Sequence, residues 1–365
     1  MVNVYVIGAG MVGSTMALDL SNDYHVHLTD YNLENLSSVQ KRNPDITTIQ
    51  LDVTDHKTLL EWLEPADIVL IGVPGYLGYQ TLMAVIGAGK NIVDISFSPE
   101  NVLELSPLAE KFGVSVIVDS GVAPGIPNFL LGYHNTKMEI KSFEYYVGGL
   151  PKYPEPPFNY KAPFSPIDVI EEYTRSARMM IDGEIVIKPA LSEIEIMDIQ
   201  DAGTLEAFNT DGLRSILTTM NHIPNMKEKT LRYPGHADIM KSYHKDGKFD
   251  SNQIEKTVAI LFDDWRLGDN EPEFTVLDVL IRDEQQTISY HLYDEFDIET
   301  GITSMSRTTG YTATASINLI LKGHFSDKGV FPPELIGAKK GCMDFILNYL
   351  ADRRVKIQKN SLRND

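Results

Sequence analysis

A glycine-rich segment near the N-terminus constrains the fold of this chain more than any other feature. It follows residues 2–7, whose β-branched and aromatic composition is typical of a buried parallel strand, and it precedes a helical stretch at 14–20. The segment reads Gly8-Ala9-Gly10-Met11-Val12-Gly13. Glycines at this spacing permit a tight turn and a close approach to a pyrophosphate, and the helix N-terminus offers N–H groups to the phosphates. We predict that these six residues bind a dinucleotide; the alternative is a glycine-rich turn in an α/β sheet without a ligand.

An acidic residue at the end of the second expected strand (25–28) indicates which dinucleotide is bound. Asp30 lies 17 residues after Gly13, close to the spacing of about 20 residues expected for the carboxylate that binds the adenosine ribose. Such a carboxylate accepts hydrogen bonds from both ribose hydroxyls and repels a 2′-phosphate. The next residues, Tyr31 and Asn32, supply no cation that could neutralise a phosphate. The sequence therefore favours NAD over NADP.

Charge and composition exclude several classes of partner. The chain has 365 residues, enough for two domains, and a net charge of −19 from 32 basic and 51 acidic residues. This acidic excess argues against nucleic acid and anionic membranes as partners. No apolar run approaches the ~20 residues needed to span a membrane. We expect no signal peptide, because the first expected strand begins at residue 2. We expect a cytoplasmic protein.

A metal site is not expected. The single cysteine, Cys342, excludes an internal disulfide and a CxxC zinc site, and the nine histidines show no HxxxH or HExxH grouping.

The first third of the chain alternates between expected strands and helices. Further strands are predicted at 46–53, 66–73, 91–95 and 114–118, with helical spacing between them, for example at 56–63 and 79–87. This alternation predicts an α/β fold with a doubly wound parallel sheet of the Rossmann type, in which ligands bind beyond the carboxyl ends of the strands. The residues expected along that edge are Gly8–Gly13, Asp30, Asp52 and Val53 near the adenine, Val73 and Pro74, Ser96 and Phe97, and Asp119-Ser120-Gly121.

The pattern changes in the middle of the chain. Long alternating runs at 141–151, 183–199, 273–283 and 287–296 are typical of an antiparallel sheet with one covered face, and helices such as 252–265 would cover it. We predict an inserted α+β domain with a mixed or antiparallel sheet at about 126–305. The helices expected at 304–323 and 337–351 would return to a first domain made of 1–125 and about 306–365. A homodimer through the middle-domain sheet is expected.

Polar residues in three stretches of the middle domain are candidates for chemistry. Tyr160 and Lys161 lie in a proline-rich loop before Ser165-Pro166, which is expected to open a helix. Asn209 precedes Gly212-Leu213-Arg214, expected as the first turn of another helix, and Arg214 could bind a carboxylate. His236 is expected at a helix N-terminus, where its neutral form suits a base. Alternatively, Lys161 is a solvated lysine, the polar residues after Asn209 are helix caps and His236 is structural.

Glu144 and Tyr146 share one face of an expected strand that ends in two glycines. A carboxylate there could hold an amine or ammonium group. The alternative is an acidic side chain on a solvent-facing strand.

Six motifs together resemble the saccharopine dehydrogenase family. They are GVAPGIPN, YYVGGLP, NYKAPFSPxDVIEEYTR, EAFNTDGLRS, TLRYPGHAD and TTGYTATASINLILKG, and the resemblance runs from Val4 to about Gly337. It implies a Rossmann domain split by an α+β catalytic and dimerisation domain. The closest resemblance is to members that use NAD to oxidise the ε-amine of L-lysine. The resemblance therefore implies that the resulting imine is hydrolysed to 2-aminoadipate 6-semialdehyde and ammonia.

The resemblance also implies roles for the candidate residues. The nicotinamide would lie over Val73, Pro74 and 120–124, and the base is expected among Lys161, Asp119 and His236. Arg214 or Arg175 would bind the substrate carboxylate, with Glu144, Tyr160 and Asn209 as further substrate contacts.

Two other functions remain open. A saccharopine- or carboxynorspermidine-type enzyme would act on a secondary amine, but its extra carboxylates call for basic residues, and the loop at 159–172 has only Lys161. A non-catalytic NAD-binding sensor would keep the fold without turnover, and the intact polar loops argue against it.

Overall fold

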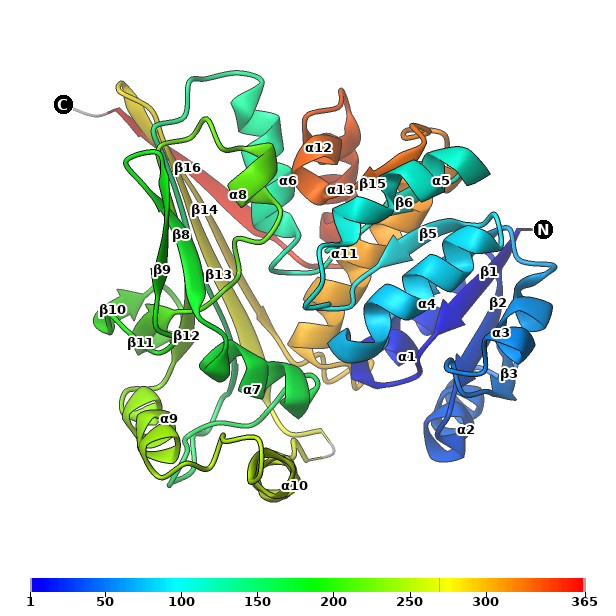
Figure 1. Ribbon diagram of the computed structural model, residues 1–365, viewed down its shortest axis with the longest axis horizontal. Coiled ribbons are helices and arrows are strands. Elements are labelled where there is room, and N and C mark those ends of the chain that lie inside the picture. The colour runs from blue at the N-terminus through cyan, green and yellow to red at the C-terminus, as the bar shows by residue number, and fades with distance from the viewer. Residues whose placement is uncertain (1, 269, 364–365) are drawn as a thin grey trace. The chain divides into compact units, whose positions relative to one another are not determined.

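The computed structural model describes residues 2–268 and 270–363, which form two compact units. Unit 1 consists of the chain up to Tyr133 together with Ser306–Arg354. Unit 2 consists of His134–Met305 and the chain from Val355 on. Figure 1 shows both units in the colours of the chain order.

Unit 1 is built on a parallel sheet in the order β15-β6-β5-β4-β1-β2-β3, which confirms the predicted doubly wound fold. Each pairing in it is parallel. Its strands are β1 (Asn3–Ile7), β2 (His25–Asp30), β3 (Thr47–Gln50), β4 (Ile68–Ile71), β5 (Asn91–Asp94), β6 (Ser115–Ile117) and β15 (Gly329–Phe331). The last of these, a three-residue run, was missed from the sequence because it is too short to show an alternating pattern.

Helices cover both faces of this sheet. Ile7, Val69 and Ile71 on one face pack with side chains of α3, α4 and α5 in a single apolar cluster. On the other side, Met16 of α1 lies against Gly72 and Gly310. The helices are α1 (Met11–Leu20), α2 (Leu33–Arg42), α3 (His56–Leu63), α4 (Gly75–Gly87), α5 (Ser106–Phe112) after the 3₁₀ turn η1 (Val102–Leu105), α6 (Ile126–Asn135), α11 (Ser304–Leu321), α12 (Pro333–Gly337) and α13 (Cys342–Asp352).

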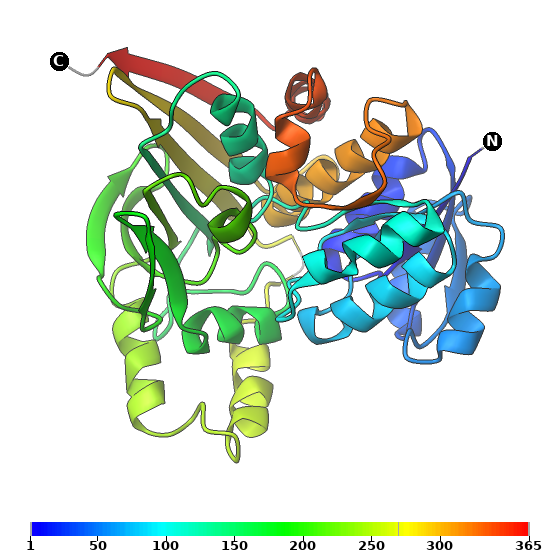
Figure 2. The same ribbon diagram turned by 45° about the horizontal axis from the view of Figure 1, so that its top comes forward.

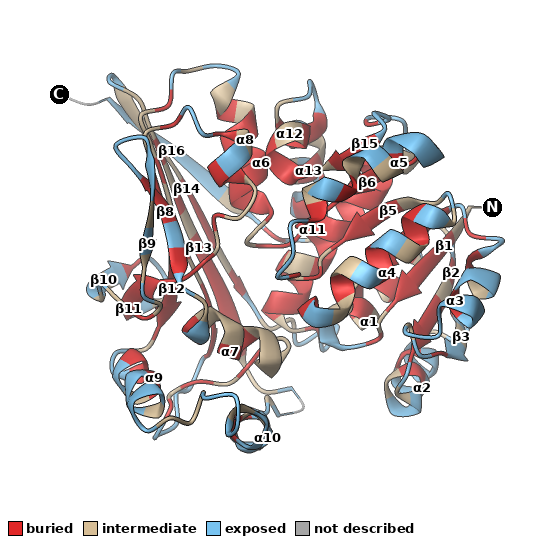
Figure 3. Ribbon diagram, in the orientation of Figure 1, coloured by how far each residue is buried: buried red, intermediate tan, exposed pale blue. Residues whose placement is uncertain are grey.

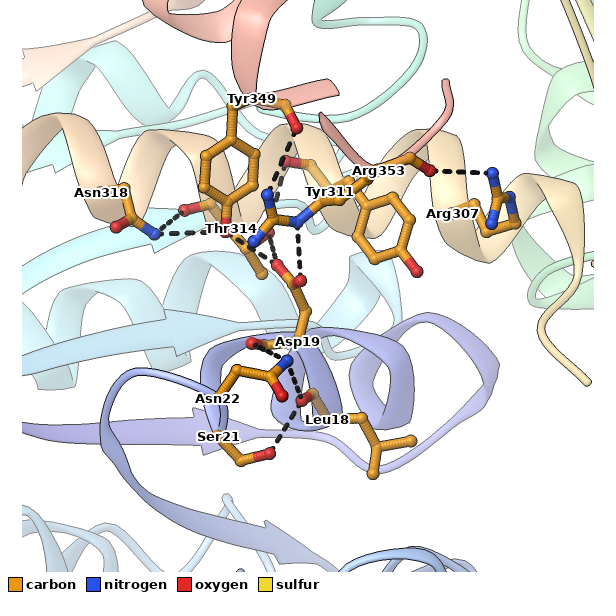
Figure 4. A network of polar contacts seen from close by, with 10 residues as sticks. All are labelled: Leu18, Asp19, Ser21, Asn22, Arg307, Tyr311, Thr314, Asn318, Tyr349 and Arg353. Carbon is orange, nitrogen blue, oxygen red and sulfur yellow. Dashed lines mark hydrogen bonds and ion pairs between the residues drawn. The ribbon is translucent and has the colours of Figure 1, made fainter. Parts of the chain in front are cut away.

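A buried carboxylate fastens α1 to the two helices contributed by the end of the chain (Figure 4). Asp19 of α1 accepts hydrogen bonds from Thr314 Oγ1 of α11 (2.6 Å), Tyr349 Oη of α13 (2.8 Å) and Arg353 Nε (2.6 Å). The Arg353 guanidinium also lies 3.5 Å from the centre of the Tyr349 ring. These contacts hold the helix that follows the glycine-rich turn.

Unit 2 is built on a mixed sheet in the order β10-β11-β12-β7-β13-β14-β16, with β8 paired to β12 and β9 to β8. Its strands are β7 (Ser142–Pro151), β8 (Ala177–Ile181), β9 (Glu184–Lys188), β10 (Glu195–Ile199), β11 (Gly203–Asn209), β12 (Asn225–Arg232), β13 (Glu273–Arg282), β14 (Gln286–Glu295) and β16 (Ile357–Arg363). The pairing of β12 with β7 is parallel. We expected the C-terminal residues in the first domain, but β16 pairs antiparallel with β14 and lies in unit 2.

Among the residues that the structure describes, four helices complete unit 2, and α7 packs against α10 (Figure 2). They are α7 (Pro166–Thr174), α8 (Ile216–Thr219), α9 (His236–Lys245) and α10 (Ile254–Asp264). We expected a helix to begin at Gly212, but α8 begins only at Ile216. Arg214 has φ +48°, which is not helical, and the Gly212 N–H is bound to Glu228 of β12. A core around Tyr173, Phe208 and Trp265 joins sheet and helices, as the buried positions in Figure 3 illustrate. Among the described residues, no helix is both long and apolar enough to cross a membrane.

We predict that Asp19→Asn destabilises unit 1. Removing one partner of a buried, hydrogen-bonded ion pair costs about 3 kcal/mol, which corresponds to a fall of about 10 °C in the Tm of a unit this size. Thermal unfolding followed by circular dichroism measures this effect. Asp23→Asn, an exposed acid just after the same helix, is the control and should leave Tm nearly unchanged. Equal shifts in the two variants would contradict a structural role of the Asp19 contacts.

Candidate functional sites in the two units

The glycine-rich turn of unit 1 is shaped by two backbone approaches that allow no side chain. A Cβ atom on Gly8, which has φ +101°, would lie 2.3 Å from Gly72 O, and a Cβ on Gly13 would lie 2.0 Å from Gly8 O. By contrast, a Cβ on Gly10 would meet nothing within 4 Å. The turn is therefore packed on its inner side and open at Gly10, where α1 begins. This arrangement leaves room for a phosphate group at the helix N-terminus.

The Asp30 carboxylate lies directly beneath this turn. Its Oδ2 accepts the Ala9 N–H at 2.6 Å, and its Oδ1 accepts the Asn32 N–H at 2.7 Å. Asp30 is buried, yet each oxygen keeps a second lone pair that could accept a ribose hydroxyl. The residues of this turn thus fit a dinucleotide, with Ala9, Met11 and Val12 providing the backbone around the glycines.

The other predicted cofactor contacts follow the carboxyl ends of neighbouring parallel strands. Val73 and Pro74 follow β4, and Pro74 is the residue before α4. Asp52 and Val53 lie just beyond β3, where hydrogen bonds from Thr54 lower the pKa of the Asp52 carboxyl. Each of these residues lies at the predicted edge of the sheet.

The segment after β6 forms a tight loop. Asp119 is buried with φ +52°, and Gly121 N–H donates to Pro124 O at 3.1 Å. A Cβ on Gly125 would lie 1.8 Å from Gly121 O, so the two glycines allow the loop to close on itself. The hydroxyls of Ser120 and Ser316 lie 2.7 Å apart, which ties this loop to α11.

In unit 2, the residues on both sides of Lys161 are anchored while Lys161 is not. The Tyr160 ring lies 4.4 Å from the Arg232 guanidinium and packs edge-on to Trp265. On the other side, Ala162 N–H donates to Trp265 O at 2.8 Å. Among the described residues, the half-buried Lys161 has no hydrogen bond or ion pair. Its amine is therefore available to a ligand or to a proton transfer.

Arg232 is the centre of a buried polar network that the sequence analysis did not identify. Its Nε donates to Tyr173 Oη at 2.9 Å, and one of its Nη atoms lies 3.0 Å from a Glu172 carboxylate oxygen. His236 completes the network: Nδ1 lies 2.9 Å from Phe158 O, and Nε2 lies 2.9 Å from Tyr173 Oη. The sequence did hold a signal for it. In the motif TLRYPGHAD, Arg232 follows Thr230 by two residues, so both side chains point to the same face of the strand, and both are buried.

Both ring nitrogens of His236 are thus occupied within unit 2. Burial, and after it the Arg232 charge, lowers the pKa of His236 to about 3. The ring is therefore neutral because of burial and the Arg232 charge, whereas the expected cause was the helix N-terminus. It is buried in the core and less accessible to a substrate than the half-buried Lys161.

The predicted amine contact Glu144 already has two cations beside it. Arg282 Nη1 lies 2.5 Å and Lys227 Nζ 3.3 Å from its carboxylate oxygens. Although burial alone would raise it, these two charges hold the pKa of Glu144 below its usual value. Tyr146 Oη also donates to this carboxylate at 3.1 Å. The negative charge of Glu144 is therefore already balanced by cations of the same sheet.

The other predicted substrate contacts are Asn209, Arg175 and Arg214. The Asn209 side chain donates to Ser192 Oγ and Glu193 Oε2, both at 3.0 Å, and thereby closes the loop between β9 and β10. Arg175 forms an ion pair with Glu171 at the end of α7. Arg214 lies in the irregular segment before α8 with a left-handed backbone.

The carboxyl group of Glu228, on β12, is buried and binds the irregular segment that precedes α8. Its two carboxyl oxygens lie 2.8 and 2.7 Å from Thr210 Oγ1, and one of them accepts the Gly212 N–H at 3.0 Å. Burial raises the pKa of Glu228 to about 8. The alternative role of the polar residues after Asn209 was that of helix caps. Of these residues, Thr210 binds Glu228, and Asp211 accepts two hydrogen bonds from the Arg178 guanidinium.

No metal site is found within residues 2–268 and 270–363, where no three His, Cys, Asp or Glu side chains cluster suitably.

We predict that Glu228→Gln changes how stability depends on pH. The folded protein keeps the Glu228 proton up to about pH 8, whereas an unfolded chain releases it near pH 4.3. Between these values the folded state binds more protons, so the wild type loses stability as pH rises, with a slope of up to about 1.4 kcal/mol per pH unit. The variant should lose that part of the slope.

Thermal unfolding of both proteins from pH 5 to 9 measures the difference. Glu255→Gln, an exposed acid in α10, is the matched control. Parallel profiles for wild type and Glu228→Gln would show that Glu228 is ionised in the folded protein.

Comparison with known proteins identifies the family. Residues 4–117 match the family model described as the saccharopine dehydrogenase NADP binding domain, and residues 121–355 match that of the saccharopine dehydrogenase C-terminal domain. The chain is 28% identical over 280 residues to saccharopine dehydrogenase (NADP(+), L-glutamate-forming) of Saccharomyces cerevisiae, covering 70% of this chain and 61% of the yeast protein. It is 27% identical over 259 residues to alpha-aminoadipic semialdehyde synthase of Arabidopsis thaliana, covering 64% of this chain and 24% of the plant protein.

The chain thus spans less than two thirds of the length of these relatives. Among solved structures, the fold is similar to that of apo saccharopine dehydrogenase (L-Glu forming) from Saccharomyces cerevisiae. The TM-score is 0.80 at 20% sequence identity, over 99% of this chain and 100% of that chain. At this identity the likeness shows a shared fold. The two family models together match most of the sequence, and the chain therefore belongs to the saccharopine dehydrogenase family.

Proposed function

We propose that this protein is an NAD-dependent dehydrogenase of the lysine 6-dehydrogenase type. It would oxidise the ε-amine of L-lysine and release 2-aminoadipate 6-semialdehyde and ammonia. The observation that carries the proposal is the glycine-rich turn fastened by the Asp30 carboxylate, in a chain of the saccharopine dehydrogenase family. A primary amine is proposed as the substrate because the six sequence motifs most resemble the family members that oxidise the ε-amine of L-lysine.

The cofactor assignment rests on the charge around the ribose position. A 2′-phosphate would lie near the Asp30 carboxylate, and the adjacent Tyr31, Asn32 and Leu33 provide no cation to neutralise it. The names of the matching domain and of the yeast relative mention NADP, so this chain would differ from them in cofactor preference. The bound nicotinamide would accept a hydride from the amine-bearing carbon of the substrate.

Lys161 is the residue that we propose as the general base. The substrate ammonium must lose a proton before its carbon can give up a hydride, and the resulting imine must then take up water. An amine without an internal partner, on a backbone fixed at Tyr160 and Ala162, can exchange protons with a bound substrate. Asp119 remains an alternative base, and Arg214 or Arg175 remain candidates for the substrate carboxylate.

A second candidate function is favoured by the names of the relatives. Saccharopine dehydrogenase acts on a secondary amine, and the yeast and plant proteins support a similar role here. The third candidate function is that of a sensor, which would bind NAD without turning over a substrate.

We predict NADH formation, followed by absorbance, with L-lysine and NAD. The panel would include saccharopine, carboxynorspermidine and L-ornithine, each with NAD and with NADP, and ammonia would be measured in parallel. Turnover of saccharopine alone would replace the first proposal by the second. Binding of NADH without turnover of any amine would favour the sensor.

Lys161→Ala should lower kcat/KM by at least about 100-fold, because a positioned general base contributes roughly 10²–10⁴ to the rate. The variant should still bind NADH, measured by fluorescence, since Lys161 is distant in sequence from the cofactor turn. Lys256→Ala, an exposed lysine of α10, is the control and should retain activity. Full activity of Lys161→Ala would remove Lys161 from the mechanism.

A further inference from the structure

The hairpin of β8 and β9 ends the sheet of unit 2 with an unpaired strand. Among the described residues, β9 (Glu184–Lys188) pairs only with β8, so one of its edges carries no backbone partner. Ile185 and Ile187 are 51% and 67% exposed, and Figure 3 shows exposed positions along this strand. An exposed apolar edge strand of this kind is a template for pairing with another chain.

The turn of the hairpin determines which backbone groups point outward. Asp182 and Gly183 connect the strands with φ values of +50° and +84°, as in a two-residue type I′ turn. In such a hairpin the flanking residues, Ile181 and Glu184, exchange both hydrogen bonds, and the pairs alternate from there. Val186 therefore bonds inward to β8, whereas Ile185 and Ile187 direct their N–H and C=O groups to the open edge.

The order of side chains along β9 is self-complementary. If a second β9 pairs antiparallel about Val186, Ile185 of one copy faces Ile187 of the other, and both present their free backbone groups. The same register places Glu184 opposite Lys188 of the second copy. Among the described residues, the Glu184 carboxylate has no hydrogen bond or ion pair, and the Lys188 ammonium is bound only to Glu193, at 2.8 Å. Shifting the register by one residue would lose both charge pairs.

We propose that β9 is the homodimer contact of this protein, formed by antiparallel pairing of two copies about Val186. The four isoleucines of the two strands form an apolar cluster on one side of the joined sheets. On the opposite face, a Glu184–Lys188 pair lies on each side of the two Val186 side chains, and backbone hydrogen bonds between the open edges fix the alignment.

The test is a charge exchange in the intact chain. Glu184→Lys and Lys188→Glu each place like charges opposite one another twice per dimer, which should raise the dissociation constant about tenfold or more. The double variant Glu184→Lys/Lys188→Glu restores opposite charges and should recover the dimer. Glu184→Lys is the primary variant, because Lys188→Glu also disturbs the pair with Glu193.

Sedimentation velocity across the micromolar range measures the association, at an ionic strength of about 0.15 M so that the net charge of −19 is screened. The controls are Glu61→Lys and Lys57→Glu, which make the same charge changes on an exposed pair of α3. A monomeric wild type would overturn the proposal. A dimer that resists both single variants, or that weakens equally in the α3 controls, would do the same.

Discussion

The hydrogen bond from the Ala9 N–H to the Asp30 carboxylate is the constraint on which the proposed cofactor site depends. It joins the turn after β1 to the end of β2, two segments 21 residues apart in sequence. The approach of Gly8 to Gly72, and of Gly13 to Gly8, fixes the same turn from its inner side. Because no Cβ fits at these two contacts, only glycine allows the backbone to lie there. These contacts consequently fix the backbone at Gly10, on the open side of the turn.

Unit 2 is organised around a buried cation instead of a turn. Moving a guanidinium out of water is costly unless its donors are bound and an anion lies near. Arg232 meets this requirement through Tyr173, Glu172 and the face of the Tyr160 ring. Since Tyr160 is next to Lys161, the arrangement that satisfies the buried charge also fixes the backbone of the proposed base.

The sequence predicted the fold where local patterns and chain connectivity agree. Strand and helix alternation identified the parallel sheet, and Asp30 was placed correctly at the end of β2. Three features escaped it because they depend on distant partners. The segment around Arg214 is held by Glu228 and Arg178 instead of forming a helix, β15 has only three residues, and β16 joins unit 2 through pairing with β14.

The candidate residues of unit 2 illustrate the same limit more sharply. Asn209, Glu144 and His236 are polar residues in distinctive motifs, yet their partners are supplied by loops and strands that no local pattern reveals. Conversely, Lys161 stands in an ordinary proline-rich loop, and its distinction is that its neighbours are fixed while its amine is not. A polar side chain that the fold already satisfies contributes its binding capacity to stability. One left without an internal partner, on a fixed backbone, retains that capacity for a ligand, and this difference is visible only once every partner is known.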